Sequence, residues 1–317
     1  MPRTLLVLGS FVADVAFRAT HLPSWGETLM GTSFALGPGG KGSNQAVAAA
    51  RSARREGPHA LIVQFVSRLA DDPFGQLARD LWAADAIDAS LVTTSTTTPT
   101  GAAAILIDQV RGENAIIVVP GACFTLTPED LEPATQAIQS AAVFLTQLEL
   151  PLDTVHRGLT MARAAGVPTI LNPAPAPATP LPADLIALAD YFIPNETEAA
   201  LLTGLPVDTV EQATAAAEAV RTAGARNVIL TLGARGALVL TRDAAPVLIP
   251  AFNAGPVLET TGAGDAFCGA FATALAEGQP LLDCVRFGCA TAGISVTRPG
   301  TAPSMPTRPE IDALLRA

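Results

Sequence analysis

Short apolar or β-branched runs alternate with alanine-rich amphipathic stretches along almost the whole chain. Such alternation is typical of βα units, in which parallel strands form one sheet and helices cover its faces. The sequence therefore predicts an α/β fold with a mainly parallel sheet flanked by helices. We predict strands at Leu5–Leu8, Leu61–Phe65, Ala142–Leu145, Thr169–Leu171, Tyr191–Ile193, Val228–Thr231 and Ala237–Leu240. We predict helices at Ser43–Arg54, Phe74–Ala86, Leu152–Ala165, Val210–Ala223, Ala263–Glu277 and Leu281–Val296.

Three regions depart from this alternation. The segments at about 14–36 and about 99–119 each read as strand followed by strand, which predicts a small β element attached to the main sheet. The stretch from Asn172 to Pro182 is rich in proline, which forbids helix, so it is either a domain boundary or a rigid extended loop. The same alternation continues on both sides of it. This favours a rigid loop within a single domain of residues 1–317.

Charge and apolar patterning narrow the classes of partner. The net charge is −10, and an acidic protein repels the phosphate backbone, so we expect no nucleic acid partner. No uninterrupted apolar run approaches the ~18 residues that a membrane span requires, so we expect no membrane association and a cytoplasmic location. The four cysteines form no CxxC pair. We therefore expect buried, reduced thiols rather than a metal site or a disulfide framework.

The first glycine cluster, GPGGKGSN, runs from Gly37 to Asn44 directly into a predicted helix. It matches GxGxxG, but it follows no first strand and lacks the later acidic residue that a dinucleotide site requires. It is not a phosphate-binding Walker loop either, because Lys41 is followed by glycine. What remains is a helix N-terminus whose free N–H groups suit an oxygen-rich ligand, or a tight turn packed under the sheet.

The second cluster, ETTGAGDAFCGAF, runs from Glu259 to Phe271 and again opens a helix. Gly262 and Gly264 allow the backbone N–H groups of the turn to face an anion. Asp265 would repel a phosphate at this place, unless its task is to accept a proton from an attacking hydroxyl. Taken alone, the carboxylate could equally be a helix cap.

Five motifs together resemble the PfkB, or ribokinase-like, family of carbohydrate kinases. They are GPGGKGSNQAVAAAR, QLELP, NPAPA, PNETEA and TTGAGDAFCGAF, in this order and over essentially the whole chain. The resemblance implies a doubly wound α/β domain with a small β lid and a homodimer that forms through the lids. It also implies transfer of the γ-phosphoryl group of ATP to a primary hydroxyl of a sugar.

Within the family the chain is most similar to the ribokinase branch, which makes ribose the first expectation for the sugar. A fructokinase-like enzyme, a nucleoside kinase and a binding protein without turnover remain as alternatives. A nicotinamide-dependent oxidoreductase would rest only on the GxGxxG match. Aromatic residues make up 5% of the chain with no cluster marking the lid. A stacked nucleobase therefore has little support, which favours a plain sugar.

The resemblance assigns a role to individual residues. Asp265 would be the catalytic base, and the turn of Gly262, Ala263 and Gly264 the anion hole. The sugar would contact Asp14, Gly39, Gly40, Lys41, Asn44 and Glu149, besides Asp265. ATP would contact Asn195, Thr231, Gly233, Gly236 and Gly264. Glu198 would hold Mg²⁺ through water, and K⁺ would lie among Glu259, Thr261, Ser295, Arg298, Gly300 and Ser304.

Two positions depart from the family pattern. Val12 stands where the ribokinase branch usually has asparagine, two residues before the sugar-binding aspartate, and valine cannot hydrogen-bond a hydroxyl. Glu259 stands where the family usually has aspartate. The first departure bears on which sugar is bound, and the second on the monovalent cation.

Overall fold

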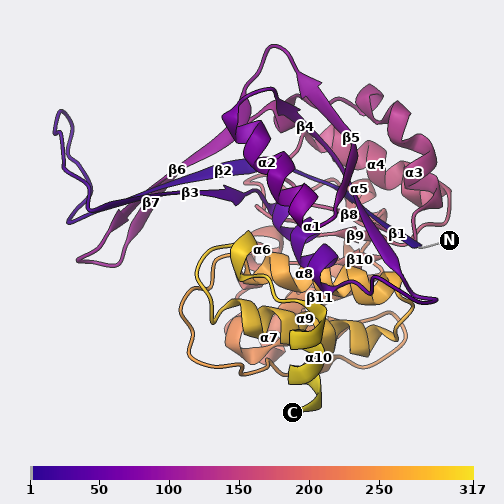
Figure 1. Ribbon diagram of the computed structural model, residues 1–317. Helices are drawn as coiled ribbons and strands as arrows, with labels where there is room; N and C mark the ends of the chain where they lie inside the picture. The colour runs from indigo at the N-terminus through magenta and orange to yellow at the C-terminus, as the bar shows by residue number, and fades with distance from the viewer. Residues whose placement is uncertain (1–2) are drawn as a thin grey trace.

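The computed structural model describes residues 3–317, and within this range nine strands form one large sheet (Figure 1). Neighbouring strands are parallel except at one edge, where β12 runs antiparallel to both β11 and β13. The order across the sheet is β13-β12-β11-β10-β9-β8-β1-β4-β5. The strands are β1 (Arg3–Leu8), β4 (Leu61–Ala70), β5 (Asp88–Ser95), β8 (Val143–Thr146), β9 (Thr169–Leu171), β10 (Tyr191–Phe192), β11 (Asn227–Thr231), β12 (Ala237–Leu240) and β13 (Val247–Ile249).

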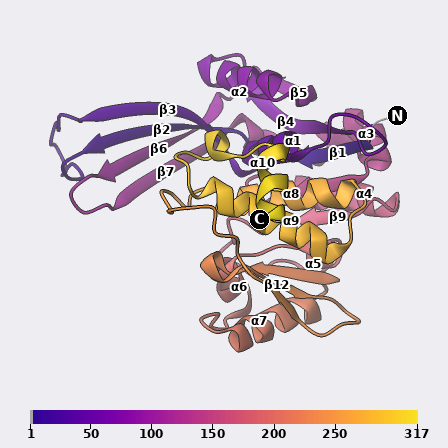
Figure 2. The same cartoon turned by 60° about the horizontal axis from the view of Figure 1, so that its bottom comes forward.

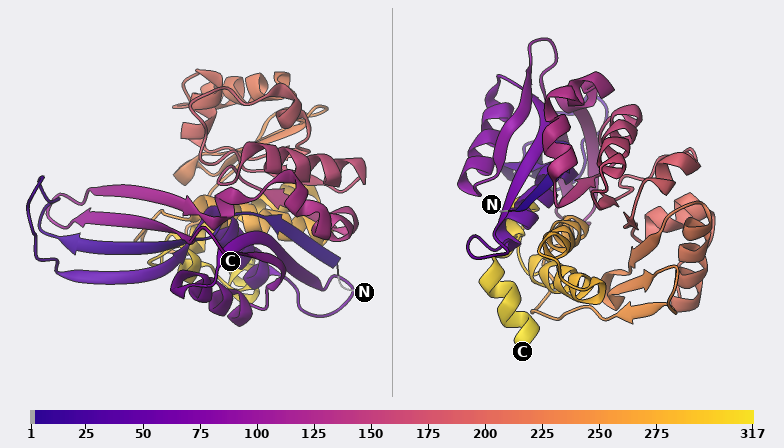
Figure 3. Two further views of the ribbon diagram at one scale, coloured as in Figure 1. Left: turned by 90° about the horizontal axis from the view of Figure 1, so that it is seen from above. Right: turned by 90° about the vertical axis from the view of Figure 1, so that its right-hand side faces the viewer.

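Helices cover both faces of the sheet because the side chains of each strand alternate between two apolar layers. Figure 3 shows helices on the two faces of the sheet. In β1, Leu5 and Val7 belong to one buried cluster, whereas Leu6 and Leu8 belong to the other. The first layer is closed by α1 (Lys41–Ser52), α2 (Pro73–Ala84), α8 (Ala263–Ala276), α9 (Leu281–Ser295) and α10 (Arg308–Arg316). The second is closed by α3 (Thr135–Ser140), α4 (Leu152–Ala164), α5 (Ala183–Ala187), α6 (Glu196–Thr203) and α7 (Val210–Thr222).

A second sheet projects from the body and forms the lid (Figures 1 and 2). Its strand order is β3-β2-β6-β7, with β2 parallel to β6 and the outer pairs antiparallel. The strands are β2 (Val12–Ala19), β3 (Ser33–Gly39), β6 (Thr100–Asp108) and β7 (Asn114–Gly121). Both regions that lack a predicted helix, about 14–36 and about 99–119, therefore lie in this lid, as expected.

The predicted α/β alternation is confirmed, and the predicted elements all exist with ends shifted by a few residues. The prediction omitted β5, β13, α3, α5, α6, α10 and the short 3₁₀ segments Ala122–Thr125, Pro128–Ala134, Gly233–Arg235 and Ala302–Ser304. The proline-rich stretch after β9 leads into α5 without breaking the sheet, since β9 and β10 on its two sides pair in parallel. Among the described residues, no helix combines the length and apolarity needed to cross a bilayer.

The order of the strands locates a crevice. From β1 the chain adds β4 and β5 on one side, and it later returns to add β8, β9, β10 and β11 on the other. The sheet is thus doubly wound, as predicted, and its winding direction reverses between β1 and β8. In such sheets ligands bind outside the carboxyl ends of the strands at this reversal point.

Candidate active site

Polar residues follow the carboxyl ends of successive parallel strands. Ser10 comes after β1, and Gln147 and Glu149 come after β8. Asn172 follows β9 and Asn195 follows β10, while Thr231 ends β11. Because these strands are parallel neighbours, their carboxyl ends bring the six side chains to one edge of the sheet.

A cavity of about 190 Å³ opens at this edge. Seven of the predicted site residues line it: Lys41, Asn195, Glu198, Thr231, Gly262, Gly264 and Asp265. Its wall is completed by Asn172, Ala174, Ile193, Thr260 and Cys268. The first and last glycine clusters, more than two hundred residues apart in the sequence, therefore meet in one pocket, as the resemblance implies.

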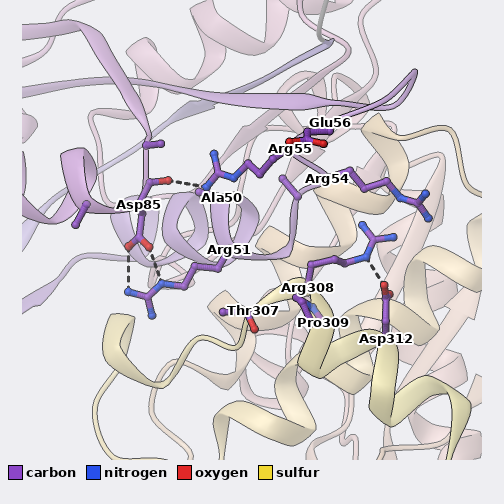
Figure 4. A pocket seen from close by; sticks show the side chains of 13 residues that line it. Ala50, Arg51, Arg54, Arg55, Glu56, Asp85, Thr307, Arg308, Pro309 and Asp312 are labelled. Carbon is purple, nitrogen blue, oxygen red and sulfur yellow. Dashed lines mark hydrogen bonds and ion pairs between the residues drawn. The ribbon is translucent and has the colours of Figure 1, made fainter.

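A larger cavity of about 800 Å³ lies at the other end of α1 and is rich in arginine (Figure 4). Its arginines already have partners: Arg51 forms a two-point ion pair with Asp85, and Arg308 pairs with Asp312. Arg51 also donates to the carbonyl oxygens of Ala302 and Met305. These contacts tie α1 to the C-terminal segment, and the lining residues include none of the predicted site.

The N-terminal turn of α8 presents backbone N–H groups to the smaller cavity. Gly262 caps the helix with φ 82°, a left-handed conformation that suits glycine, and Thr301 packs beside it. The N–H of Ala263 donates to the carbonyl of Thr260 at 3.2 Å. Among the described residues, the N–H groups of Gly264 and Asp265 have no such partner, so these two are the donors that the turn leaves free for a ligand.

Asp265 is buried and held by two amide side chains from α1. Its Oδ2 accepts from Nδ2 of Asn44 at 3.1 Å, and its Oδ1 accepts from Nε2 of Gln45 at 2.9 Å. A carboxylate has about four acceptor positions, so roughly two remain for a ligand. Both amides face Asp265 as donors, and together they fix the orientation of its carboxylate.

Asp14 and Glu149 lie toward the lid, outside the lining of the smaller cavity. The carboxylate of Asp14 lies against Gly39, where a Cβ atom would come within 2.4–2.6 Å of it, so a larger residue at this position would displace the carboxylate. Burial, and then the charges of Glu149, Asp265 and Glu259, raise the pKa of Asp14 to about 6. Glu149 is fixed differently, because its Oε2 accepts from the Ser10 hydroxyl at 2.5 Å and from the Lys41 N–H at 2.8 Å.

Lys41 lies among these carboxylates at the first residue of α1. Burial lowers the pKa of its ammonium group, but Asp265, Glu149 and Glu198 outweigh that effect, so the pKa is raised overall. Lys41 therefore remains a cation between the two ends of the pocket. Gly40, which caps α1, has its backbone against Phe11 and Val12 at the start of the lid.

Glu198 lies in the first turn of α6 and is tied to Asn195 in a reciprocal cap. Its Oε2 accepts from the Asn195 backbone N–H at 2.9 Å and its Oε1 from the Asn195 side chain at 3.0 Å. Burial raises the pKa of Glu198, against the opposing effects of the Asn195 hydrogen bond and Lys41. With both oxygens already accepting, this carboxylate suits a hydrated Mg²⁺ better than direct ligation. No cluster of three or more His, Cys, Asp or Glu side chains suited to a metal occurs among residues 3–317.

The predicted nucleotide residues and the predicted monovalent-cation residues lie in two separate segments of the chain. Gly233 and Gly236 form the turn after Thr231, closed by a hydrogen bond from Leu232 N to Gly236 O at 2.7 Å. On the other side, Oε2 of Glu259 accepts from the Gly300 N–H at 2.8 Å. The hydroxyls of the two serines, Ser295 and Ser304, are used by the carbonyls of Ala292 and Thr301, and Arg298 pairs with Glu310.

The motifs assign no role to four polar residues of this site: Ser10, Gln45, Gln147 and Asn172. Gln45 directly follows Asn44, and Gln147 stands two residues before Glu149 in the QLELP motif, so each is close in sequence to a residue with an assigned role. Neither amide could be placed without the fold, because their contacts join α1 to the ends of β8 and β9.

Comparison with known proteins agrees with this geometry. The model of the pfkB family carbohydrate kinases matches residues 2–308. The chain is 38% identical to ribokinase of Haemophilus influenzae, with 98% of this chain and 97% of that protein covered. It is 35% identical to deoxyribokinase of Salmonella typhi over 96% of this chain and 95% of the other. The solved structure of Arabidopsis thaliana ribokinase complexed with ribose and ATP has 33% identity, full coverage of both chains and a TM-score of 0.93. The chain therefore belongs to the pfkB family of carbohydrate kinases and is a phosphotransferase with an alcohol group as acceptor.

Proposed function

We propose that the protein transfers the γ-phosphoryl group of ATP to the primary hydroxyl of ribose, giving ribose 5-phosphate. The observation that carries the proposal is the position of Asp265, a buried carboxylate with free acceptor positions beside the unpaired N–H groups of the α8 turn. The ribokinases of Haemophilus influenzae and Arabidopsis thaliana support ATP and ribose as the two substrates.

In this mechanism the base and the anion hole act on neighbouring atoms. The sugar hydroxyl gives its proton to Asp265, and the hydroxyl oxygen forms a bond to phosphorus as the bond from phosphorus to the ADP oxygen breaks. The N–H groups of Gly264 and Asp265 donate to the phosphoryl oxygens, whose charge they stabilise. Asp14 and Glu149 accept hydrogen bonds from other hydroxyls of the sugar and fix its orientation.

The nucleotide would lie toward the opposite side of the pocket. Asn195, Thr231, Gly233 and Gly236 are proposed to contact ATP, and Gly264 its γ-phosphate. Mg²⁺, held through water near Glu198, would supply neutralisation of phosphate charge. K⁺ is proposed to lie beside the turn closed by Glu259 and Gly300.

Mutation of Asp265 tests the assignment. Asp265→Asn keeps the shape of the side chain but removes the proton acceptor, so we expect kcat to fall roughly 10²–10⁴-fold with little change in ATP affinity. A coupled assay of ADP release over pentoses, hexoses and nucleosides measures both turnover and substrate choice. A variant that retains more than about half of the wild-type kcat would contradict the role of Asp265 as base.

A second candidate substrate is 2-deoxyribose, and Val12 favours it. In β2 the side chains of Val12 and Asp14 share one face of the strand, and Val12 is buried. An apolar group beside the sugar-binding carboxylate suits a carbon that lacks a hydroxyl. The 35% identity to Salmonella typhi deoxyribokinase is consistent with this alternative. Comparing kcat/KM for ribose and 2-deoxyribose in the same assay distinguishes the two.

We also propose that residues 1–317 act as one kinase domain and that two copies associate through their lids. The cross-strand register places Phe17, Phe34, Leu36, Ile117 and Val119 on one face of the lid, and all five are exposed. A second copy would cover this apolar face. Light scattering coupled to gel filtration is expected to give twice the chain mass, and Phe17→Glu is expected to reduce it to one chain. A wild-type protein of one chain mass would refute the lid dimer.

A further inference from the structure

A chain of buried amides connects three of the five motifs to Asp265. Nε2 of Gln147 donates to Oε1 of Gln45 at 2.6 Å. Nε2 of Gln45 in turn donates to Oδ1 of Asn172 at 3.0 Å and to Oδ1 of Asp265 at 2.9 Å. Every hydrogen-bonding group of the Gln45 side chain that the structure describes is used in these contacts, and Gln45 is fully buried.

The direction of donation along this series of amides is set by one backbone carbonyl group. Nδ2 of Asn172 donates to the carbonyl oxygen of Ile193 at 2.8 Å, so Oδ1 of Asn172 must face Gln45. Gln45 must then present its NH₂ group to Asn172, and the same NH₂ group reaches Asp265. A rotated Gln45 amide would place three acceptor oxygens together and would set its NH₂ group against that of Gln147.

The orientation of these amides leaves one oxygen of Gln147 unpaired, which has an energetic cost. Oε1 of Gln147 is buried and has no hydrogen-bond partner among the described residues. An unsatisfied buried oxygen lowers the stability of the fold, and the hydrogen bond from Gln147 to Gln45 offsets part of this loss.

We propose that Gln45 is a positioning residue for Asp265, and that the Asn172 and Gln147 amides together hold the Gln45 amide in its donor orientation. This inference rests on the proposed role of Asp265 as base. The Gln45 contact holds Oδ1, and Asn44 holds Oδ2, so the carboxylate cannot rotate and its remaining acceptor positions face the pocket. Loss of the Gln45 contact frees the carboxylate to turn away from the attacking hydroxyl.

The test compares variants at two of the amide residues, Gln45 and Gln147, with a matched control. Gln45→Met keeps the length of the side chain and removes its donors, and Gln147→Met leaves Gln45 in place but removes one of the two amide contacts that hold its orientation. The control is Gln64→Met, because Gln64 on β4 makes a similar amide contact with Asp88 at 3.0 Å, outside the pocket. We expect Gln45→Met to lower kcat roughly tenfold or more while KM for sugar and ATP changes by less than about threefold. Gln147→Met should have a smaller effect of the same kind, and Gln64→Met none.

The split between kcat and KM supplies a readout that a merely structural role would not move. A carboxylate that turns within the pocket slows proton transfer from the bound hydroxyl, whereas the groups that hold the sugar and ATP are unchanged. The other charged or titratable groups that face Asp265 are Asp14 from β2, Lys41 from α1, Glu198 from α6 and Cys268 from α8, and all stay in place.

The outcomes are distinguishable. A wild-type kcat in both Gln45→Met and Gln147→Met, with Asp265→Asn inactive, would overturn the positioning role alone. An active Asp265→Asn would overturn the proposed base and this inference with it. If Gln45→Met fails to fold, as judged by thermal unfolding, Gln147→Met decides: a lowered kcat with little change in KM supports the proposal, and wild-type behaviour refutes it.

Discussion

Replacement of Asp14 by asparagine is expected to stabilise the ligand-free protein above about pH 6 while it weakens sugar binding. Burial, together with the charges of Glu149, Asp265 and Glu259, raises the pKa of this carboxyl from 3.8 to about 6. The ionised form of Asp14, which is proposed to bind the sugar, therefore lowers the free energy of unfolding. Asp14→Asn removes the charge and keeps the shape of the side chain.

The magnitude follows from the two pKa values of Asp14. The folded value of about 6 exceeds the reference value of 3.8 by roughly two units, which corresponds to an upper limit of about 3 kcal/mol. Because the folded pKa is the higher one, the folded protein binds the proton more tightly. The destabilisation is therefore absent below pH 3.8, grows as the pH rises toward 6, and is complete above 6.

Unfolding in denaturant at about pH 4 and about pH 8 measures this difference. Asp14→Asn should exceed the wild type in free energy of unfolding at the higher pH and approach it at the lower one. Asp243→Asn, at an exposed loop carboxylate, serves as the control and should show no such trend. The reasoning is refuted if Asp14→Asn is less stable than the wild type at about pH 8, or if its advantage is independent of pH.

Three further substitutions test the remaining roles. Glu198→Gln keeps one of the two contacts that Glu198 accepts from Asn195 and removes the charge, so the Mg²⁺ concentration for half-maximal rate should rise severalfold; an unchanged Mg²⁺ dependence would mean that Glu198 only caps α6. Val12→Asn should lower KM for ribose by up to roughly tenfold if it adds one hydrogen bond, whereas loss of activity would point to a deoxy or apolar part of the substrate at Val12. K⁺ should raise kcat only modestly, and Glu259→Asp should increase the response because the longer side chain alters the fit of a cation cage. Rates at constant ionic strength with K⁺ replaced by Na⁺ check this, and a strongly K⁺-dependent wild type would contradict it.

The main sheet could be predicted because its strands are buried on both faces. A run such as Leu5–Leu8 is apolar at every position, and the stretches between such runs have the period of a helix, so the two signals do not overlap. The edge strand β5 was missed because only part of each side chain is buried and polar residues dominate its sequence. In α6, the reciprocal cap of Asn195 and Glu198 marks the start, but the helix is short and ends at Gly204, so its apolar pattern is brief.

Many residues of the candidate site could be named from the sequence, but the hydrogen bonds between them could not. Asp265 and Lys41 stand in glycine-rich turns, whose composition alone indicates an unusual backbone. Gln45 and Gln147 have no such marker, since a glutamine in an alanine-rich helix or after a strand reads as a surface residue. Their role depends on long-range contacts that form only when the ends of β8 and β9 lie beside α1.

Position, rather than basicity, distinguishes the proposed base from the other carboxylates of the site. The raised pKa of Asp14, about 6, makes it a stronger proton acceptor than an ordinary aspartate, so basicity alone would favour it. Asp14, however, stands on the lid strand β2 against Gly39, whereas Asp265 is in the helical turn whose N–H groups face the anion. A general base must first lie within hydrogen-bonding reach of the proton that it removes, and its pKa matters only after that. The attacking hydroxyl must meet the phosphoryl group over the α8 turn, and there Asp265 is the carboxylate held with acceptor positions free. Asp14→Asn should accordingly raise KM for the sugar far more than it lowers kcat, the reverse of the pattern expected for Asp265→Asn, and a loss confined to kcat would show that the two roles had been exchanged.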